Sequence, residues 1–169
     1  QQAQGVAAHL AAQFPETPPQ VRFAMRYGQP AVRTVLTELR AQGVRRLLVL
    51  PLYPQFSSST TAAVYDAVAA VYRHWYWFPE TRFINDYYQD AGYIAALAAT
   101  VRAHWAQQTP GERLLISFHG LPQRLIRAGD PYYDQCLATA AALAAALELP
   151  QTRWEVVFHR REDGHAYPR

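Results

Sequence analysis

A histidine at position 119 is the residue of this sequence with the clearest chemical potential. It follows an apolar run at residues 114–118 and precedes Gly120 and Pro122 in the segment Ser-Phe-His-Gly-Leu-Pro. Glycine permits a sharp turn and a close ligand approach, and proline prevents a preceding strand from continuing. A neutral imidazole there could bind a divalent metal or accept a proton near neutral pH. The alternative is a histidine that only braces its own loop, and the local sequence leaves both interpretations open.

A second candidate segment, residues 51–61, reads Pro-Leu-Tyr-Pro-Gln-Phe-Ser-Ser-Ser-Thr-Thr. Its prolines stiffen the loop, and the rings of Tyr53 and Phe56 can stack on a planar ligand. The hydroxyl groups that begin at Ser57 could bind carboxylates, or could only cap a following helix. The segment is not a phosphate-binding loop, because it lacks both the required glycine spacing and a lysine.

A third candidate is the pair Arg26 and Tyr27, which precedes Gly28. A guanidinium can hold a carboxylate with two hydrogen bonds, so this pair could bind an anionic ligand. A solvent-facing turn would have the same composition. The other histidines show no spacing typical of metal ligands, and we interpret four of them as incidental surface residues: His9, His104, His159 and His165.

The three candidate segments share one position, because each follows an expected β-strand. Helical spacing of apolar residues predicts helices at 5–13, 32–39, 62–72, 93–105 and 134–147. Short apolar runs predict strands at 21–25, 47–50, 82–84, 114–118 and 154–158, with 47–50 and 114–118 buried on both faces. The alternation predicts an α/β fold, a mostly parallel sheet with helices on both faces. Ligands of such sheets bind beyond the carboxyl ends of the strands.

The composition excludes several classes of protein. Half of the residues are apolar and 17% are charged, which indicates a globular core and not a disordered chain. The net charge of +3 comes from dispersed arginines and argues against nucleic acid as a partner. Cys136 is the single cysteine, which excludes an internal disulfide and an all-cysteine metal site. With no apolar run near the roughly 20 residues of a membrane span, and no signal-peptide pattern, we expect a cytoplasmic protein.

The combined motifs resemble the ferrochelatase family, and most of all its bacterial, protoporphyrin-using branch. The resemblance rests on Met-Arg-Tyr-Gly-Gln-Pro at 25–30, the loop at 50–61, Ser-Phe-His-Gly-Leu-Pro at 117–122 and Gly-Asp-Pro-Tyr-Tyr at 129–133. It covers residues 21–158. The family has two flavodoxin-like α/β domains with a porphyrin cleft between them. This implies a first domain at 1–108 that lacks its opening strand, and the beginning of a second at 109–169.

By this resemblance the chain would insert ferrous iron into protoporphyrin IX, the last step of haem biosynthesis. His119 would bind the entering metal or accept pyrrole protons, and Arg26, Tyr27, Tyr53 and Ser57 would contact the substrate. A neutral imidazole suits this role, because two pyrrole N–H protons must leave as iron enters. Porphyrin and iron would be substrates, with no permanently bound cofactor and a transient contact with a membrane or a haem acceptor. Some relatives hold an iron–sulfur cluster through a cysteine where this chain has Ser58, so no cluster is expected.

Several family features have no counterpart in this sequence. Among them are the Asn-Leu-Gly-Thr-Pro loop, the Gly-Gly-Ser-Pro segment and the acidic residue that works with His119, and the Gln-Ser-Arg pattern expected after Phe158 is replaced. We therefore expect a truncated or frame-shifted reading with an atypical tail after residue 158. A sheet that lacks a strand exposes unpaired backbone, which predicts marginal stability and little or no chelatase activity for this chain alone.

Three other interpretations remain open at the level of sequence. The chain could be a tetrapyrrole- or metal-binding fragment that is not an enzyme. It could be a cobalt or nickel chelatase of a sirohydrochlorin-type ring, although such relatives lack the hydroxyl-rich loop at 51–61. It could be a flavodoxin-like module that binds a nucleotide or a flavin, but no phosphate-binding loop supports that reading.

Overall fold

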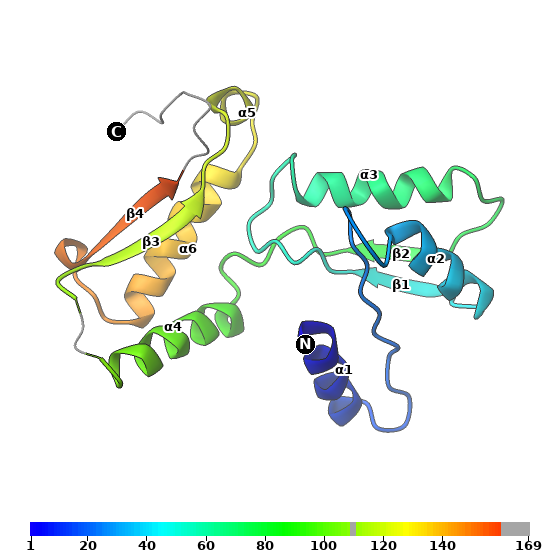
Figure 1. Cartoon of the computed structure of the whole chain (residues 1–169), viewed down its shortest axis with the longest axis horizontal. Coiled ribbons are helices and arrows are strands. Elements are labelled where there is room, and N and C mark those ends of the chain that lie inside the picture. Colours follow the sequence, from blue (N-terminus) through cyan, green and yellow to red (C-terminus); the bar gives the residue numbers. More distant parts are fainter. Residues whose placement is uncertain (109–110, 160–169) are drawn as a thin grey trace. The chain divides into compact units, whose positions relative to one another are not determined.

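The computed structural model describes residues 1–108 and 111–159 and shows helices alternating with short strands (Figure 1). Parallel strand pairing with intervening helices confirms the α/β class. The elements are α1 (Gln2–Gln13), α2 (Val32–Ala41), β1 (Arg46–Val49), α3 (Thr61–Tyr72), β2 (Glu80–Phe83), α4 (Ala91–Trp105), β3 (Leu114–His119), α5 (Gln123–Arg127), α6 (Tyr132–Ala146), a 3-10 turn (Gln151–Arg153) and β4 (Trp154–His159).

All of the predicted helices are present, and so are all of the predicted strands but one. The strand expected at 21–25 is absent, because this stretch is irregular apart from a single bridge between Met25 and Ala31. The short helix α5 was not predicted, since its five residues are too few to show a helical period.

The chain divides into two compact units. The first comprises residues 1–49 and 63–82, and the second comprises residues 50–62 and the chain from residue 83 onward. The hydroxyl-rich loop therefore belongs to the same unit as β3 and α6. The predicted boundary, between a first domain at 1–108 that lacks its opening strand and the beginning of a second at 109–169, adjoins residues 109–110, which lie outside the described residues, and it stays a prediction.

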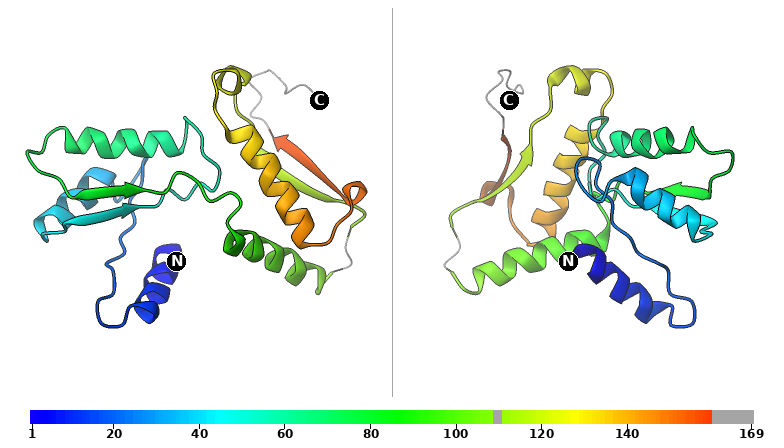
Figure 2. Two further views of the ribbon diagram at one scale, coloured as in Figure 1. Left: turned by 180° about the vertical axis from the view of Figure 1, so that it is seen from behind. Right: turned by 45° about the vertical axis from the view of Figure 1, so that its right-hand side comes forward.

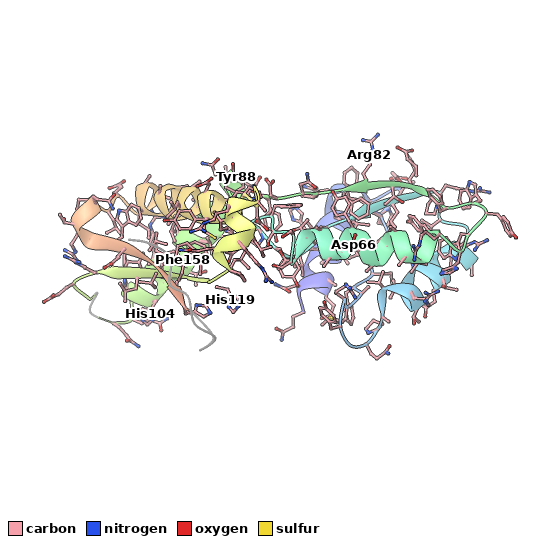
Figure 3. The ribbon with its side chains drawn as sticks, turned by 90° about the horizontal axis from the view of Figure 1, so that it is seen from above. Asp66, Arg82, Tyr88, His104, His119 and Phe158 are labelled. Carbon is pink, nitrogen blue, oxygen red and sulfur yellow. The ribbon has the colours of Figure 1, made fainter. Side chains whose placement is uncertain are left out.

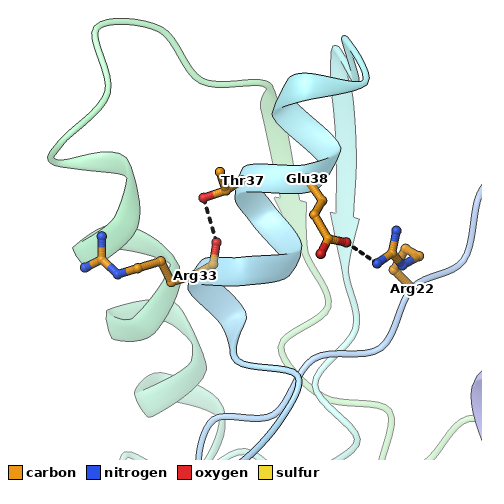
Figure 4. A network of polar contacts seen from close by, with 4 residues as sticks. All are labelled: Arg22, Arg33, Thr37 and Glu38. Carbon is orange, nitrogen blue, oxygen red and sulfur yellow. Dashed lines mark hydrogen bonds and ion pairs between the residues drawn. The ribbon is translucent and has the colours of Figure 1, made fainter.

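The core of the first unit is formed by α2 and α3. Helix α2 buries Val35, Leu36 and Leu39 along one stripe, and α3 contributes Val68 and Val71. The chain before α2 is tied to that helix by an ion pair between Arg22 and Glu38, shown in Figure 4. On the same helix Thr37 Oγ1 donates a hydrogen bond of 2.8 Å to the carbonyl of Arg33.

The core of the second unit lies between α4, α6 and the β3–β4 sheet. Ala98 on α4 is fully buried against Leu143 of α6 and Leu147, which follows that helix. Around these three pack half-buried apolar side chains, among them Leu97, Val101, Trp105, Leu114 and Ile116. Strands β3 and β4 lie side by side with α6 running along them (Figure 2). Their pairing is parallel, with Leu114 opposite Trp154 and His119 opposite His159.

The prediction that residues 47–50 and 114–118 are buried on both faces was wrong. Exposure alternates along β1 and β3, and Leu48 and Leu115 are 62% and 58% exposed. The physical reason is that successive side chains of a strand point to opposite faces, and in the described residues each sheet has only two strands. These strands thus carry more apolar side chains than the described structure buries. Within the described residues, no helix combines the length and the apolar character that crossing a membrane requires.

Candidate active site at the carboxyl end of β3

Two histidines meet at the carboxyl end of the β3–β4 sheet. His119 is the last residue of β3, His159 is the last residue of β4, and the parallel register places them opposite each other. Nδ1 of His119 lies 3.2 Å from Nε2 of His159, and the ring planes are inclined at 74°. Both side chains are exposed. His159 is exposed, as its interpretation as a surface residue expects, but nothing in that interpretation predicted the contact with His119 that strand pairing creates.

The alternation of the strands explains why both imidazoles point the same way. Phe158 stacks on Tyr133 of α6 with ring centroids 5.2 Å apart, so it faces that helix. The next residue along each strand must then face the opposite side. Accordingly, His119 lies on the side of β3 that faces away from α6 (Figure 3). Ser117, two residues before His119, shares this face.

Ser117, His159 and His119 form a hydrogen-bonded chain. Ser117 Oγ lies 3.1 Å from Nδ1 of His159, whose Nε2 meets Nδ1 of His119. If His159 donates from Nδ1 to Ser117, its Nε2 accepts from Nδ1–H of His119, and Nε2 of His119 keeps a free lone pair. If Ser117 donates instead, the protons shift along the chain and Nε2 of His119 carries one. The arrangement therefore allows His119 to accept or deliver a proton at its exposed nitrogen.

The sequence contained a signal for the His159 partner. Both strands end in Phe-His, in Leu-Leu-Ile-Ser-Phe-His and in Trp-Glu-Val-Val-Phe-His. Two parallel strands of equal length that pair from their first residues bring their last residues together. The spacing rules for metal ligands miss such a pair, because 40 residues separate the two histidines.

The structure places Tyr53 and Ser57 differently within the hydroxyl-rich loop. Tyr53 is 42% exposed, whereas Ser57 is completely buried. The Ser57 hydroxyl donates to Oδ2 of Asp130 at 3.0 Å and lies 2.9 Å from Oγ of Ser59. A direct contact between Ser57 and a substrate would require this loop to open, so its substrate-binding role stays a prediction.

Asp130 is the central acceptor that holds this loop. Its Oδ2 accepts from the Ser57 hydroxyl, from the Ser58 amide at 2.8 Å and from the Ser58 hydroxyl at 2.7 Å. Its Oδ1 accepts from the Tyr132 amide at 3.0 Å, at the start of α6. Partial burial alone would raise the pKa of Asp130, but the hydrogen bonds from Ser58, from the Tyr132 amide and from Ser57 outweigh it and lower the pKa.

Two polar residues of α6 extend this anchoring. Oε1 of Gln135 accepts from the backbone amide of Phe56 at 2.6 Å. The buried Nε2 of Gln55 donates to Oγ1 of Thr139 at 2.9 Å, and that hydroxyl lies 2.9 Å from the carbonyl oxygen of Tyr88. The available signal was the four-residue spacing of Gln135 and Thr139 in a helix otherwise rich in alanine and leucine. Polar residues on the buried face of such a helix need partners.

Removal of the Asp130 charge is expected to weaken the fold and to change its response to acid. Asp130→Asn should lower the free energy of unfolding by about 1–3 kcal/mol at pH 7, because the buried Ser57 hydroxyl and the donors of Ser58 and Tyr132 lose a charged acceptor. A lowered folded pKa stabilises the fold above the unfolded pKa of about 3.9, and this contribution is lost as pH falls through the folded value. The variant should therefore lose less stability than the parent between neutral and acidic pH. Urea unfolding at a series of pH values measures both effects.

The matched control for this experiment is Asp134→Asn, which removes an exposed carboxylate in the first turn of the same helix. This control should unfold like the parent across the pH series. Equal acid sensitivity of Asp130→Asn and the parent protein would contradict the anchoring role of Asp130.

Arg26 and Tyr27 lie in the first unit. Arg26 Nε donates to the carbonyl of Ala63 at 3.0 Å, and its guanidinium carbon lies 4.7 Å from the centroid of the Tyr27 ring. Tyr27 is 76% exposed. An open groove of about 550 Å³ is lined by Arg26 together with Arg33, Asp66 and Arg73. The groove thus offers three guanidinium groups and one carboxylate, and the substrate contacts of Arg26 and Tyr27 stay predictions.

Comparison with known proteins decides the family. A sequence model described as Ferrochelatase matches residues 1–166. This chain belongs to the ferrochelatase family. The family model matches more of the chain than the motifs do, because the motif resemblance covers residues 21–158. The match also includes most of the tail after residue 158, which departs from the expected motif. Residues 160–169 of this tail lie outside the described structure.

Individual ferrochelatases from bacteria are similar to the chain over most of its length. Ferrochelatase of Thioalkalivibrio sulfidiphilus (strain HL-EbGR7) is 51% identical over 160 residues, which cover 95% of this chain and 43% of that protein. Ferrochelatase of Nitrosococcus oceani is 51% identical over 142 residues, covering 84% and 39%. Ferrochelatase 1 of Shewanella oneidensis is 46% identical over 160 residues, covering 95% and 48%. The chain thus spans less than half the length of each of these ferrochelatases.

Proposed function

We propose that this chain forms part of the site at which a ferrochelatase inserts ferrous iron into protoporphyrin IX to form haem. The observation that carries the proposal is the placement of His119. It lies in the His-Gly-Leu-Pro motif, at the carboxyl end of β3, with an exposed imidazole held by a second imidazole. A site at the end of a parallel strand is where α/β proteins bind their ligands.

The chemistry needs a group that handles both protons and metal. Ferrous iron replaces two pyrrole protons, so the overall reaction releases two protons for each metal inserted. Nε2 of His119 is proposed to accept one of them, and Ser117 and His159 adjust the proton positions behind it. The exposed faces of Tyr53 and Tyr27 suit contact with a flat macrocycle, and Arg26 suits a propionate carboxylate. Ser57 would reach the porphyrin only after release from Asp130.

No resident cofactor and no iron–sulfur cluster are included in this proposal. Cluster ligation requires several cysteine thiolates, and this sequence has only Cys136. Burial raises the pKa of the Cys136 thiol to about 12, so that it stays protonated at neutral pH. Ser58 stands where some relatives have a cluster-binding cysteine, and its hydroxyl donates a hydrogen bond to Asp130.

We further propose a cytoplasmic location, with transient delivery of haem to a membrane or a protein acceptor. The support is chemical, because a single buried cysteine suits a reducing compartment and haem is a largely apolar product. A second candidate function is binding of a tetrapyrrole or metal without turnover. It is favoured by the exposed imidazoles of His119 and His159, whose facing nitrogens lie 3.2 Å apart and could bind a metal without turnover.

A chimeric enzyme separates the two candidates. The matching 160 residues of the Thioalkalivibrio sulfidiphilus ferrochelatase are replaced by those of this chain, and formation of zinc protoporphyrin is followed by fluorescence. The chimera is expected to form zinc protoporphyrin, because the Thioalkalivibrio sulfidiphilus ferrochelatase supplies the rest of the fold. The 169-residue chain alone is expected to show little or no activity. A folded chimera without turnover, beside an active parent enzyme, would overturn the proposed function in favour of binding alone.

A further inference from the structure

The contact between His119 and His159 has a geometry that a metal ion can use. Their facing nitrogens, Nδ1 and Nε2, lie 3.2 Å apart. With metal–nitrogen bonds of about 2.1 Å, two nitrogens at that separation subtend about 100° at the metal. This value lies between the angles of octahedral and tetrahedral coordination. Both rings are exposed and join the backbone by a soft terminal torsion, so they can turn until both lone pairs aim at one ion.

Ser117 supplies the support that a metal-bound histidine usually has. A ligating imidazole commonly donates its second N–H to an oxygen, which fixes the tautomer and the ring orientation. Nδ1 of His159 lies 3.1 Å from Ser117 Oγ, and donation along this contact leaves Nε2 of His159 without a proton. Metal binding then requires that the proton on Nδ1 of His119 moves, by exchange with water, to Nε2 of the same ring, so that both facing nitrogens carry a lone pair.

We propose that Nδ1 of His119 and Nε2 of His159 together bind one divalent transition-metal cation, in place of the proton that the two imidazoles share. Zinc, cobalt and ferrous ions are the chemical class that imidazole ligands favour, in contrast to magnesium and calcium. The expectation for a ferrochelatase motif involves His119 alone. The second ligand is His159, at a position where the resemblance to the family implies glutamine and this chain has histidine.

Two protein ligands make this a site that holds a cation briefly and does not store it. Within the residues that the structure describes, no cluster of three or more histidine, cysteine or acidic side chains is arranged to hold a metal. Among the described residues the pair thus supplies two ligands, and the other coordination positions can take water or incoming nitrogen ligands. A role for this cation in catalysis rests on the proposed function. In that role the site would hold ferrous iron before its transfer to the porphyrin. The binding itself does not depend on that function.

Isothermal titration of the purified 169-residue chain with zinc chloride tests the pair directly. Both His119→Ala and His159→Ala are expected to lower the zinc affinity about a hundredfold, because each removes one arm of a two-point contact. The double variant, which keeps neither arm, should bind zinc at least as weakly as either single variant. His104→Ala removes an exposed histidine of α4 and is the matched control, with an expected affinity equal to that of the parent.

A second measurement on the unaltered chain makes the test independent of variant folding. Nitrogen-15 spectra of the histidine rings should show that zinc shifts Nδ1 of His119 and Nε2 of His159 together, whereas magnesium shifts neither. Zinc affinity that survives His159→Ala, or a spectrum in which only one of the two nitrogens responds, would overturn the proposal. Neither experiment involves porphyrin or turnover, so an inactive chimera would overturn the proposed function and leave this result standing.

Discussion

Replacement of His119 by alanine in the chimeric enzyme is expected to lower kcat for zinc insertion by about 10²–10⁴-fold. The reason is that the exposed Nε2 of this imidazole is the proposed acceptor for a pyrrole proton, held in place by His159 and Ser117. Alanine removes the acceptor and leaves the backbone of β3 unchanged. Steady-state fluorescence of zinc protoporphyrin gives kcat and KM separately, and the loss should fall on kcat.

Three additions to this experiment distinguish a chemical role from a structural one. Free imidazole in the buffer should restore part of the activity of His119→Ala, because a small base can occupy the vacated space. His104→Ala should have the kcat of the parent chimera, since His104 lies on α4. A fall in activity that imidazole does not relieve, together with a lowered unfolding temperature, would reduce His119 to a structural residue.

Leu143→Ala is expected to produce the largest loss of stability, about 2–5 kcal/mol in the free energy of unfolding. Leu143 is 6% exposed and packs against Ala98 and Leu147 between α4 and α6. The substitution removes apolar contacts and leaves a cavity that rigid helices can only partly close. Because whole domains are stable by about 5–15 kcal/mol, a loss of this size removes a large fraction of the total stability.

The control is Leu137→Ala, which makes the same chemical change on the same helix at a side chain that is 37% exposed. It should change the free energy of unfolding by about 0.5 kcal/mol or less. Urea titrations of the 169-residue chain, followed by circular dichroism, compare the two variants with the parent. Equal effects at the two positions would show that the α4–α6 contact is not the main core of this unit.

The local elements could largely be predicted from the sequence, because helices and most strands depend on periodicity along the chain. Helix α4, for example, begins close to the expected residue, where the side chain of Asp90 accepts from the Tyr93 amide at 2.9 Å. The prediction of a strand at 21–25 was wrong. A β-strand needs a second strand with which to form hydrogen bonds, and among the described residues this segment forms only one bridge, between Met25 and Ala31. The prediction that Leu48 and Leu115 are buried was wrong for a related reason. Burial depends on what covers the face of a sheet, and the sequence of a strand does not show this.

The candidate site was predictable only in part. His119 and its place after a strand followed from local sequence, whereas its contact with His159 depends on a register between strands 40 residues apart. The hydroxyl run suggested ligand binding or helix capping, but it gave no sign that Ser57 and Ser58 donate hydrogen bonds to the carboxylate of Asp130. No rule of local spacing relates residue 57 to residue 130. Such pairs follow from tertiary packing.

The fastening of the hydroxyl-rich loop to α6 has a consequence for the order in which the protein matures. The hydrogen bonds that hold Gln55, Phe56 and Ser57 reach partners 73 to 84 residues later in the chain. A ribosome releases residues from the amino terminus onward, so the loop leaves the tunnel well before its partners exist. Until α6 emerges, the buried polar groups of the loop must be satisfied by water or by a chaperone. The shape of this loop can therefore be set only after α6 has left the tunnel.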